Sequence, residues 1–379
     1  MPTTVAEIDL DAIRANYSAV AARVKPARVM AVVKANAYGH GAVPVARALL
    51  QEGAACLGVA LIDEGIELRR HGITAPILVF GGFLAADAAR LVANDLQATL
   101  YTDEQFQALA SSAQRAKKTA AVHIKIDTGM GRVGIGWEKA ADFVEKVTAK
   151  SNIDLQGVFT HLATSDEVDK SFARKQLQRF NLALESMRRK GIEPPAVHAA
   201  NSGAILDLPE SWYNLVRPGV MLYGYYPSPE TSKSVLLRPA MTLKTRVLHV
   251  KTVAPGTSLS YGRKYIVERS TRIATLAVGY ADGYNRLLSN RGEVLIRGKV
   301  CPVRGRVCMD LILADIGPDG DAAAGDEAIL FGTDGEHCIS VDSLCEKLQT
   351  IPYEVTCWVS KRVERIYRSS EPIFSAANR

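Results

Sequence analysis

The chain has 379 residues, and its 46 basic and 40 acidic side chains leave a formal net charge of +6. The excess is small and its basic clusters are short, which excludes a dense nucleic-acid-binding surface and leaves a mild bias toward small anionic substrates. No apolar run reaches the roughly 18 residues of a membrane span. Apolar residues make up 47% of the chain, enough for a sizeable core and for two or three domains.

The cysteines and the N-terminal segment indicate a cell compartment. The six cysteines show no C-x-x-C spacing, so we expect free thiols in a reducing compartment and no metal site. The segment MPTTVAEIDLDAIRANYSAV has no basic stretch followed by an apolar one, as a secretory signal would have. We therefore expect a cytoplasmic protein.

Strand-like and helix-like segments alternate along the first part of the chain. After an amphipathic helical segment at 8–24, eight short apolar segments are typical of strands: 28–36, 55–61, 77–82, 97–102, 120–127, 155–162, 196–201 and 214–224. Helical patterns separate them at 42–52, 63–72, 85–96, 103–116, 137–150, 169–190 and 202–208. This alternation predicts a parallel sheet. Eight units in about 200 residues favour a closed (β/α)₈ TIM-like barrel over an open sheet.

The pattern changes after a linker-like segment at 226–238. Alternating apolar and polar segments typical of strands follow at 241–253, 272–280, 292–307, 311–316 and 326–332, with one helix expected at 340–350. Turn signals such as Pro255-Gly256 separate them. We therefore expect an α/β barrel domain over 1–235 and a mostly β C-terminal domain over 236–379.

Polar residues stand at the carboxyl ends of the expected barrel strands, where the sites of such barrels lie. Lys34 follows three apolar residues. Desolvation there would make its amine a nucleophile able to form a Schiff base, although a lysine whose amine reaches the solvent at the rim is the simpler interpretation. The other polar residues at these ends are Lys125, Asp127, Arg132, His161, His198 and Arg217.

The segments after the last two strands could bind a phosphate. Ser202-Gly203 opens a helix, Gly219 follows the eighth strand, and Arg217 lies beside it. Backbone N–H groups at such places bind phosphate. An amine and a phosphate site at one mouth fit a phosphorylated aldehyde cofactor, and a sugar-phosphate enzyme fits as well.

Motifs spread over nearly the whole chain, from about residue 8 to 370, resemble those of the alanine racemase family, which is pyridoxal-phosphate-dependent and of fold type III. They are AVVKANAYGHG, HIKIDTGMGRVG, NLVRPGVMLYG, SLSYGRKY, VGYADGY, RVCMD and PYEV. One departure is Glu364 in RVERIY, where that family often has proline. The resemblance implies alanine racemase activity, with pyridoxal 5'-phosphate as cofactor and D-alanine for a bacterial cell wall as product.

The resemblance also implies roles for individual residues. Lys34 would carry the cofactor and act as one base, and Tyr261 of the partner subunit would be the base on the opposite face, so that two subunits form a homodimer with shared sites. Arg217 would bind the pyridine nitrogen, and His161 would link Tyr261 to Arg217. Arg132 and Met309 would bind the substrate carboxylate, and Lys125 could be carbamylated to orient Arg132. The phosphate would be held by Tyr38, Ser202, Gly219, Val220 and Tyr353.

Two other interpretations stay open. A broad-specificity or serine racemase of the same fold would differ only by small changes in the pocket, which leave faint traces in a sequence. A pyridoxal-phosphate carrier that consists of a single barrel would lack the residues after 236 and would be indifferent to replacement of Tyr261.

Overall fold

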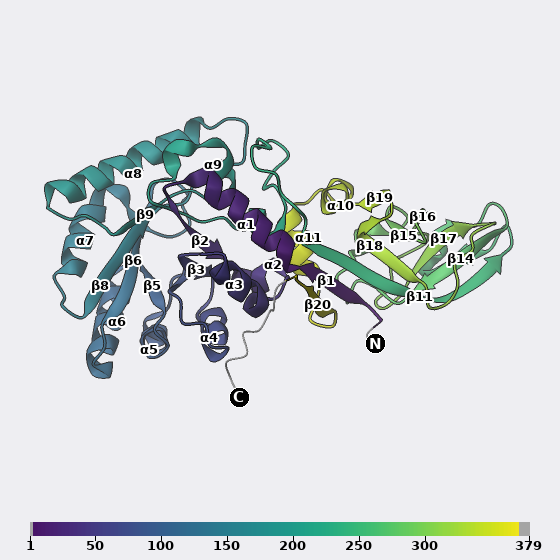
Figure 1. Ribbon diagram of the computed structural model, residues 1–379, viewed down its shortest axis with the longest axis horizontal. Helices are drawn as coiled ribbons and strands as arrows, with labels where there is room; N and C mark the ends of the chain where they lie inside the picture. The colour runs from purple at the N-terminus through teal and green to yellow at the C-terminus, as the bar shows by residue number, and fades with distance from the viewer. Residues whose placement is uncertain (1–2, 371–379) are drawn as a thin grey trace. The chain divides into compact units, whose positions relative to one another are not determined.

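The computed structural model describes residues 3–370, which form two compact units (Figure 1). The barrel unit comprises residues 12–37 and 42–238. The β unit comprises 38–41 and the described residues of 1–11 and 239–379. A boundary near residue 235 between independently folding domains stays a prediction.

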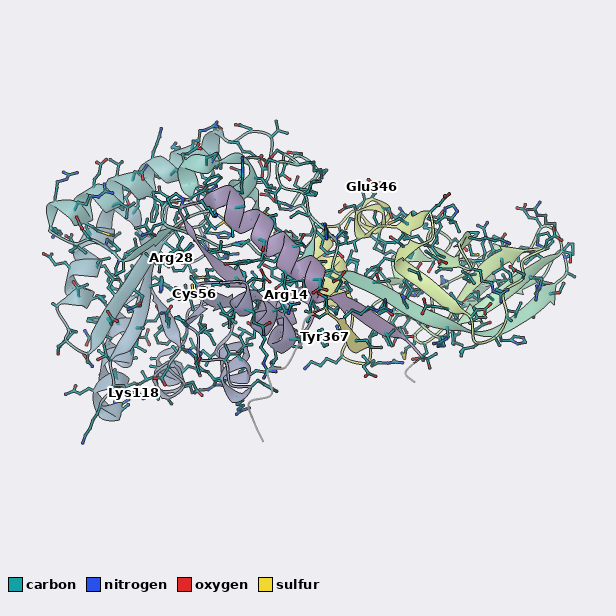
Figure 2. All side chains as sticks on the ribbon, in the orientation of Figure 1. Arg14, Arg28, Cys56, Lys118, Glu346 and Tyr367 are labelled. Carbon is teal, nitrogen blue, oxygen red and sulfur yellow. The ribbon has the colours of Figure 1, made fainter. Side chains whose placement is uncertain are left out.

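Eight parallel strands form the sheet of the barrel unit, so the prediction of a (β/α)₈ barrel is confirmed (Figure 1). Neighbours pair in the order β10-β2-β3-β4-β5-β6-β8-β9, and a short β7 (Ile135–Gly136) pairs with the end of β6. Most strand residues are buried and apolar, as in a sheet covered on both faces. Figure 2 labels Arg28 and Cys56, at the starts of β2 and β3. The strands are β2 (Arg28–Val32), β3 (Cys56–Val59), β4 (Ile77–Val79), β5 (Gln97–Leu100), β6 (Ala120–Asp127), β8 (Ile153–Phe159), β9 (Ala196–His198) and β10 (Leu215–Val216).

One asparagine side chain closes the barrel between β9 and β10. Asn214 Oδ1 accepts a hydrogen bond from Val197 N at 2.8 Å, and Asn214 Nδ2 donates to Pro195 O at 2.9 Å. Beyond β10, Arg217 N donates to Ala200 O at 2.9 Å. These hydrogen bonds replace the backbone hydrogen bonds that β10, with only two residues, does not make to β9. They hold in place the segment that leads to Arg217.

Helices cover the outside of the barrel strands (Figure 1). The longest of them buries one apolar stripe: in α8, Leu177, Phe180 and Leu184 recur at spacings of three and four residues. Among residues 3–370, no helix is long and apolar enough to cross a membrane. The helices are α1 (Leu10–Val24), α3 (Ala42–Gln51), α4 (Ile62–Arg70), α5 (Ala88–Ala93), α6 (Asp103–Ala116), α7 (Ala140–Thr148), α8 (Ser171–Arg189) and α9 (Ser202–Asp207).

Several elements differ from the sequence-based expectation: the strand expected at 214–224 is only Leu215–Val216, and a 3₁₀ helix follows at Val220–Tyr223. Two further differences lie near the start of the chain. The helix expected from residue 8 begins at Leu10, because residues 5–9 form β1, which pairs with β11 and β20 in the β unit. The strand expected to reach residue 36 ends at Val32, because Lys34–Tyr38 forms α2, a turn that contains left-handed backbone. Both differences arise from contacts with residues far along the chain.

The β unit is built around β11 (Met241–Val253), which pairs with β1, β14 and β18. The expected strand at 292–307 is instead a hairpin, with a two-residue turn at Arg297-Gly298 whose φ values of 50° and 69° suit tight hairpins. Helix α11 and strand β20 were not expected. The remaining elements are β1 (Val5–Asp9), β12 (Ser258–Leu259), β13 (Tyr265–Ile266), β14 (Thr271–Leu276), β15 (Glu293–Ile296), β16 (Lys299–Pro302), β17 (Ile312–Gly317), β18 (Glu327–Asp334), β19 (His337–Ile339), β20 (Glu364–Arg368), α10 (Val341–Leu348) and α11 (Pro352–Trp358).

Candidate active site

Lys34, at the carboxyl end of β2, starts a strained turn. Residues 35–38 have φ of 52° or 53°, a left-handed conformation that costs a non-glycine residue about 1–2 kcal/mol. Inside the barrel unit, Asn36 Oδ1 accepts a hydrogen bond from Ala42 N at 2.8 Å and so helps to hold the turn. Strain of this kind persists only where its surroundings fix it, and it gathers at functional sites.

The carboxylate of Glu64 also fixes this turn. Glu64 Oε1 accepts a hydrogen bond from Ala35 N at 2.6 Å, and Oε2 accepts from Ala60 N at 2.7 Å and Leu61 N at 3.0 Å. Glu64 therefore caps its own helix, α4, and ties the end of β3 to the residue after Lys34. The direction in which Lys34 leaves the backbone depends on this carboxylate.

Arg217 is buried at the carboxyl end of β10, with 5% of its surface exposed. Its guanidinium bonds to His198 Nδ1 at 2.9 Å, Thr160 O at 2.8 Å and Ala199 O at 3.0 Å, and lies 3.4 Å from His161 Nδ1. Since guanidinium only donates hydrogen bonds, the two ring nitrogens accept them. Burial lowers the pKa of Arg217 to about 9, which leaves it charged at pH 7.

Phe159 lies inside the barrel, where its ring contacts a histidine ring and two basic side chains. Its ring stacks on that of His198, with centroids 4.8 Å apart and planes 5° apart. Lys125 Nζ lies 4.6 Å from the Phe159 ring centre, and Arg217 Cζ lies 5.4 Å from it. The negative face of an aromatic ring attracts cations, so Phe159 helps the barrel to hold two buried basic groups.

Four basic side chains gather around His161. Burial, and then the charges of Lys125, Arg217, Arg132 and Lys34, hold the pKa of His161 well below its usual 6.5. Burial, followed by Arg217 and Arg132, likewise lowers the pKa of Lys125 well below 10.5. At pH 7 we therefore expect a neutral His161 ring among basic side chains, and a Lys125 amine that loses its proton more readily than a lysine in water.

Arg132 lies in a glycine-rich turn after β6. Asp127 Oδ1 accepts hydrogen bonds from Gly129 N at 2.9 Å and Gly131 N at 3.2 Å, which fix the turn. The Asp127 charge also acts in the opposite direction on the pKa of Lys125. Because the effect of Asp127 on Lys125 is smaller than those of burial, Arg217 and Arg132, this carboxylate offsets only part of the positive charge at the mouth.

The segments after β9 and β10 meet at Ser202. Its side chain is buried, and its Oγ accepts a hydrogen bond from Gly219 N at 3.0 Å. Asn201 Oδ1 accepts from Ala204 N at 3.1 Å and starts the short helix α9. Ser202, Gly219 and Val220, proposed from the sequence to hold a phosphate, thus lie together in the barrel unit.

Three sequence motifs of the β unit converge around Tyr261 and Met309. Ser260 Oγ lies 3.5 Å from Cys308 Sγ, and Tyr280 N donates a hydrogen bond to Cys308 O at 3.0 Å. Tyr261 is 71% exposed, Met309 52% and Tyr280 42%. Clustered exposed apolar side chains of this kind are typical of a surface that a partner covers.

Tyr38 and Tyr353 lie together in the β unit, with ring centroids 5.8 Å apart. The segment that carries Tyr38 docks against α11: Gly39, with φ of +86°, has no room for a Cβ next to Thr356 O. Arg365 Nε donates to Gly39 O at 3.1 Å. The residue pair expected to hold a phosphate is therefore fixed by contacts within one unit.

The residues expected from the sequence thus fall into two sets. The barrel unit holds Lys34, Lys125, Arg132, His161, Ser202, Arg217, Gly219 and Val220, and the β unit holds Tyr38, Tyr261, Met309 and Tyr353. Sequence reasoning missed Glu64 and Phe159. A glutamate at the third position of α4 is the usual signal of a capping box, but nothing local connects it to Lys34.

Known proteins match this chain over the whole of its described length. Residues 8–227 match the model of the alanine racemase N-terminal domain, and 240–367 that of the C-terminal domain. Alanine racemase 2 of Caldanaerobacter subterraneus subsp. tengcongensis is 45% identical over 100% of this chain and 97% of its own. The solved alanine racemase of Clostridium difficile 630 is 41% identical, with a TM-score of 0.93 over 98% of this chain and 97% of its own. A histidine racemase of Leuconostoc mesenteroides subsp. sake is 27% identical, with a TM-score of 0.90 over 97% and 98%.

Proposed function

The chain belongs to the alanine racemase family and racemises alanine, and we propose that it does so with pyridoxal phosphate and two bases, Lys34 of one subunit and Tyr261 of the partner subunit. The observation that supports this most is the group of four basic side chains around His161. A phosphorylated cofactor and an amino-acid carboxylate are both anions, and such a mouth attracts and orients them.

The residues of the barrel unit fit the cofactor in charge and kind. When bound, pyridoxal phosphate draws electrons from the α-carbon of an attached amino acid and so makes its α-proton acidic. Lys34 supplies the amine for the covalent link. Ser202, Gly219 and Val220, together with Tyr38 and Tyr353 of the β unit, would hold the phosphate.

Racemisation needs the α-proton to leave one face and another to arrive on the opposite face, which two bases achieve most simply. Lys34 Nζ serves one face. Tyr261 serves the other, and its large exposure within its own chain suits a residue that acts in the site of the partner subunit. The protein would then be an obligate homodimer.

His161 and Arg217 support the phenolate of Tyr261. A free tyrosine is only about 0.1% ionised at pH 7. Because Arg217 donates toward His161 Nδ1, the proton of the neutral His161 ring stands on Nε2. From there it can be donated to the phenolate oxygen, which favours the ionised form that removes a proton.

Arg217 also limits side reactions. It would donate a hydrogen bond to the pyridine nitrogen of the cofactor without giving up its own proton. By leaving that nitrogen unprotonated, Arg217 would weaken the electron withdrawal that the cofactor supplies and so favour racemisation over transamination.

Arg132 would bind the substrate carboxylate, together with the backbone at Met309, and Lys125 would orient Arg132. The lowered pKa of Lys125 increases the fraction of neutral amine, which can add to carbon dioxide with an N–C bond formed and one proton released. The resulting carbamate would give Arg132 an anionic partner. Native mass spectrometry after incubation with bicarbonate tests this, and an unchanged mass would contradict it.

The compartment and the assembly are also proposals. All six cysteines are free, as in a reducing compartment such as the cytoplasm. Among residues 3–370, no group of three His, Cys, Asp or Glu side chains could hold a metal ion. Sedimentation at assay concentration tests the homodimer, and a fully active monomer would exclude the shared site.

A broad-specificity or serine racemase is the second candidate. The structural likeness to a histidine racemase favours keeping it, because the fold is compatible with more than one side chain. Rates with L-alanine, L-serine and L-histidine under one set of conditions decide between the candidates. We expect alanine to be fastest.

The test of the mechanism is proton exchange in D₂O by the purified protein with added pyridoxal phosphate. Lys34→Ala should lose all activity. Tyr261→Phe should lose racemisation but keep α-proton exchange of one enantiomer, because one base remains. Tyr265→Phe, in the neighbouring strand β13, is the matched control. Racemisation by Tyr261→Phe at the rate of the control would exclude the two-base proposal.

A further inference from the structure

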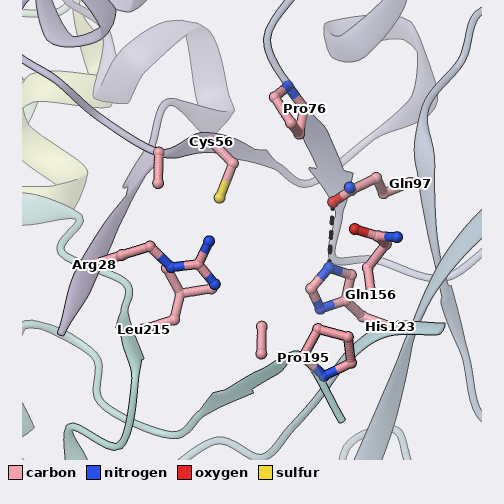
Figure 3. A pocket seen from close by; sticks show the side chains of 10 residues that line it. Arg28, Cys56, Pro76, Gln97, His123, Gln156, Pro195 and Leu215 are labelled. Carbon is pink, nitrogen blue, oxygen red and sulfur yellow. Dashed lines mark hydrogen bonds between the residues drawn. The ribbon is translucent and has the colours of Figure 1, made fainter.

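A hydrogen-bonded chain leads from Arg217 into the barrel, away from its mouth. Arg217 Nη1 bonds to His198 Nδ1 at 2.9 Å, and His198 Nε2 lies 3.0 Å from His123 Nδ1. His123 Nε2 in turn lies 3.2 Å from Gln97 Oε1 (Figure 3). Gln97 is the first residue of β5, so the chain ends near the amino end of the barrel.

Only one arrangement of protons satisfies every bond in this chain. Arg217 can only donate, so His198 Nδ1 accepts and its proton stands on Nε2. His198 Nε2–H then donates to His123 Nδ1, which places the proton of His123 on Nε2. That N–H donates to Gln97 Oε1, so the series of hydrogen bonds runs in one direction, from the Arg217 guanidinium to the amide oxygen of Gln97, which is its last acceptor.

Both histidines are neutral, as this arrangement requires. Burial, and then the charge of Arg217, lowers the pKa of His123 to about 3 and that of His198 well below 6.5. No carboxylate takes part in this series of hydrogen bonds. Arg217 therefore meets acceptors that hold it in place without neutralising its charge.

We propose that Gln97 and His123 are positioning residues for the racemisation. They hold His198 in the Nε2–H tautomer and thereby keep the acceptor that orients the Arg217 guanidinium. Without His123, the buried Nε2–H of His198 loses its partner, which is unfavourable. A shift of the proton to Nδ1 would then place one N–H against another at Arg217. The proposal rests on the proposed function, in which Arg217 contacts the cofactor.

A cavity of about 130 Å³ makes the far end of this chain accessible. Gln97, His123, Gln156 and Arg28 are among the residues that line it, and the Arg28 side chain points into it (Figure 3). Cavities of about 150 Å³ bind a benzene ring. Removal of the His123 ring should therefore leave room for added imidazole.

The first experiment reads the tautomers in holoenzyme labelled with ¹⁵N-histidine. The chain has seven histidines, and His123→Phe and His198→Gln identify the two signals. We expect neutral Nε2–H rings for both residues at pH 7. A charged ring or an Nδ1–H tautomer at His198 would overturn the proposal whatever the activity, whereas correct tautomers without alanine racemisation would count against the proposed function alone.

The second experiment measures kinetics. Gln97→Leu and His123→Phe should lower kcat about three- to tenfold, the worth of one hydrogen bond, with KM for alanine changed less than about twofold. Imidazole should restore kcat to His123→Ala but not to His123→Phe, whose ring fills the space. Gln156→Leu is the control, because Gln156 lines the same cavity but is not part of the hydrogen-bond series from Arg217 to Gln97. Wild-type kcat in both Gln97→Leu and His123→Phe, or an equal response of the two His123 variants to imidazole, would overturn the proposal.

Discussion

Replacement of Glu64 by glutamine should loosen the turn that carries Lys34. The carboxylate accepts three backbone hydrogen bonds, one from Ala35 and two from residues 60 and 61. An amide keeps one acceptor oxygen, and its NH₂ group faces an N–H on the other side. Glu64→Gln therefore loses either the bond to the turn or the two bonds to the end of β3.

The expected magnitude follows from the bonds and from the strain that they oppose. One or two partly exposed bonds, at about 0.5–1.5 kcal/mol each, amount to about 0.5–3 kcal/mol. Four left-handed residues at 35–38 store about 4–8 kcal/mol in total. The free energy lost with these hydrogen bonds is comparable to the strain of one or two left-handed residues. The turn should therefore relax in part while the barrel stays folded.

The assay is the affinity for pyridoxal phosphate together with the melting temperature. At about 2–4 °C per kcal/mol, Glu64→Gln should lower Tm by a few degrees. It should also weaken cofactor binding, because Lys34 no longer leaves the backbone in a fixed direction. Glu67→Gln, on the exposed side of the same helix, is the control. Wild-type Tm and cofactor affinity in Glu64→Gln would refute the reasoning.

Three further predictions concern the two units. Asn214→Ala removes both bonds between β9 and β10 and should lower the free energy of unfolding by about 1–3 kcal/mol, as urea titration would show; an unchanged midpoint would contradict the closure. His123 has a pKa of about 3 in the folded protein and near 6.5 in the unfolded chain, so as the pH falls the unfolded chain takes up this proton first. The contribution of His123 to the free energy of unfolding should therefore be fully present above pH 6.5 and fall by about 1.4 kcal/mol per pH unit down to pH 3. His123→Gln should flatten this slope, and parallel curves for the two proteins would contradict the assignment. Gly279→Ala would place a Cβ on Met309 O and should lower both activity and Tm. Gly136→Ala is the control: its added Cβ would meet only the end of one flexible side chain, so the same thermal-shift and activity assays should show little change.

The sequence by itself determined the fold class and supplied most of the residues that we propose for the site. Apolar runs separated by helical periodicity are local patterns, and each of the eight barrel strands overlaps its expected segment because burial on both faces leaves that pattern in the sequence, although most strands are shorter than expected. The motifs around Lys34, Tyr261 and Met309 are also local, so residue order alone was enough to identify them.

The tertiary structure decided the features that join distant parts of the chain. The left-handed turn after Lys34 depends on Glu64 on another element, and the pairing of β1 with β20 joins the two ends of the described chain. The chain from Gln97 to Arg217 crosses four strands. No local pattern encodes these contacts, because the free energy of a buried hydrogen bond depends on which partner the folded backbone brings within reach.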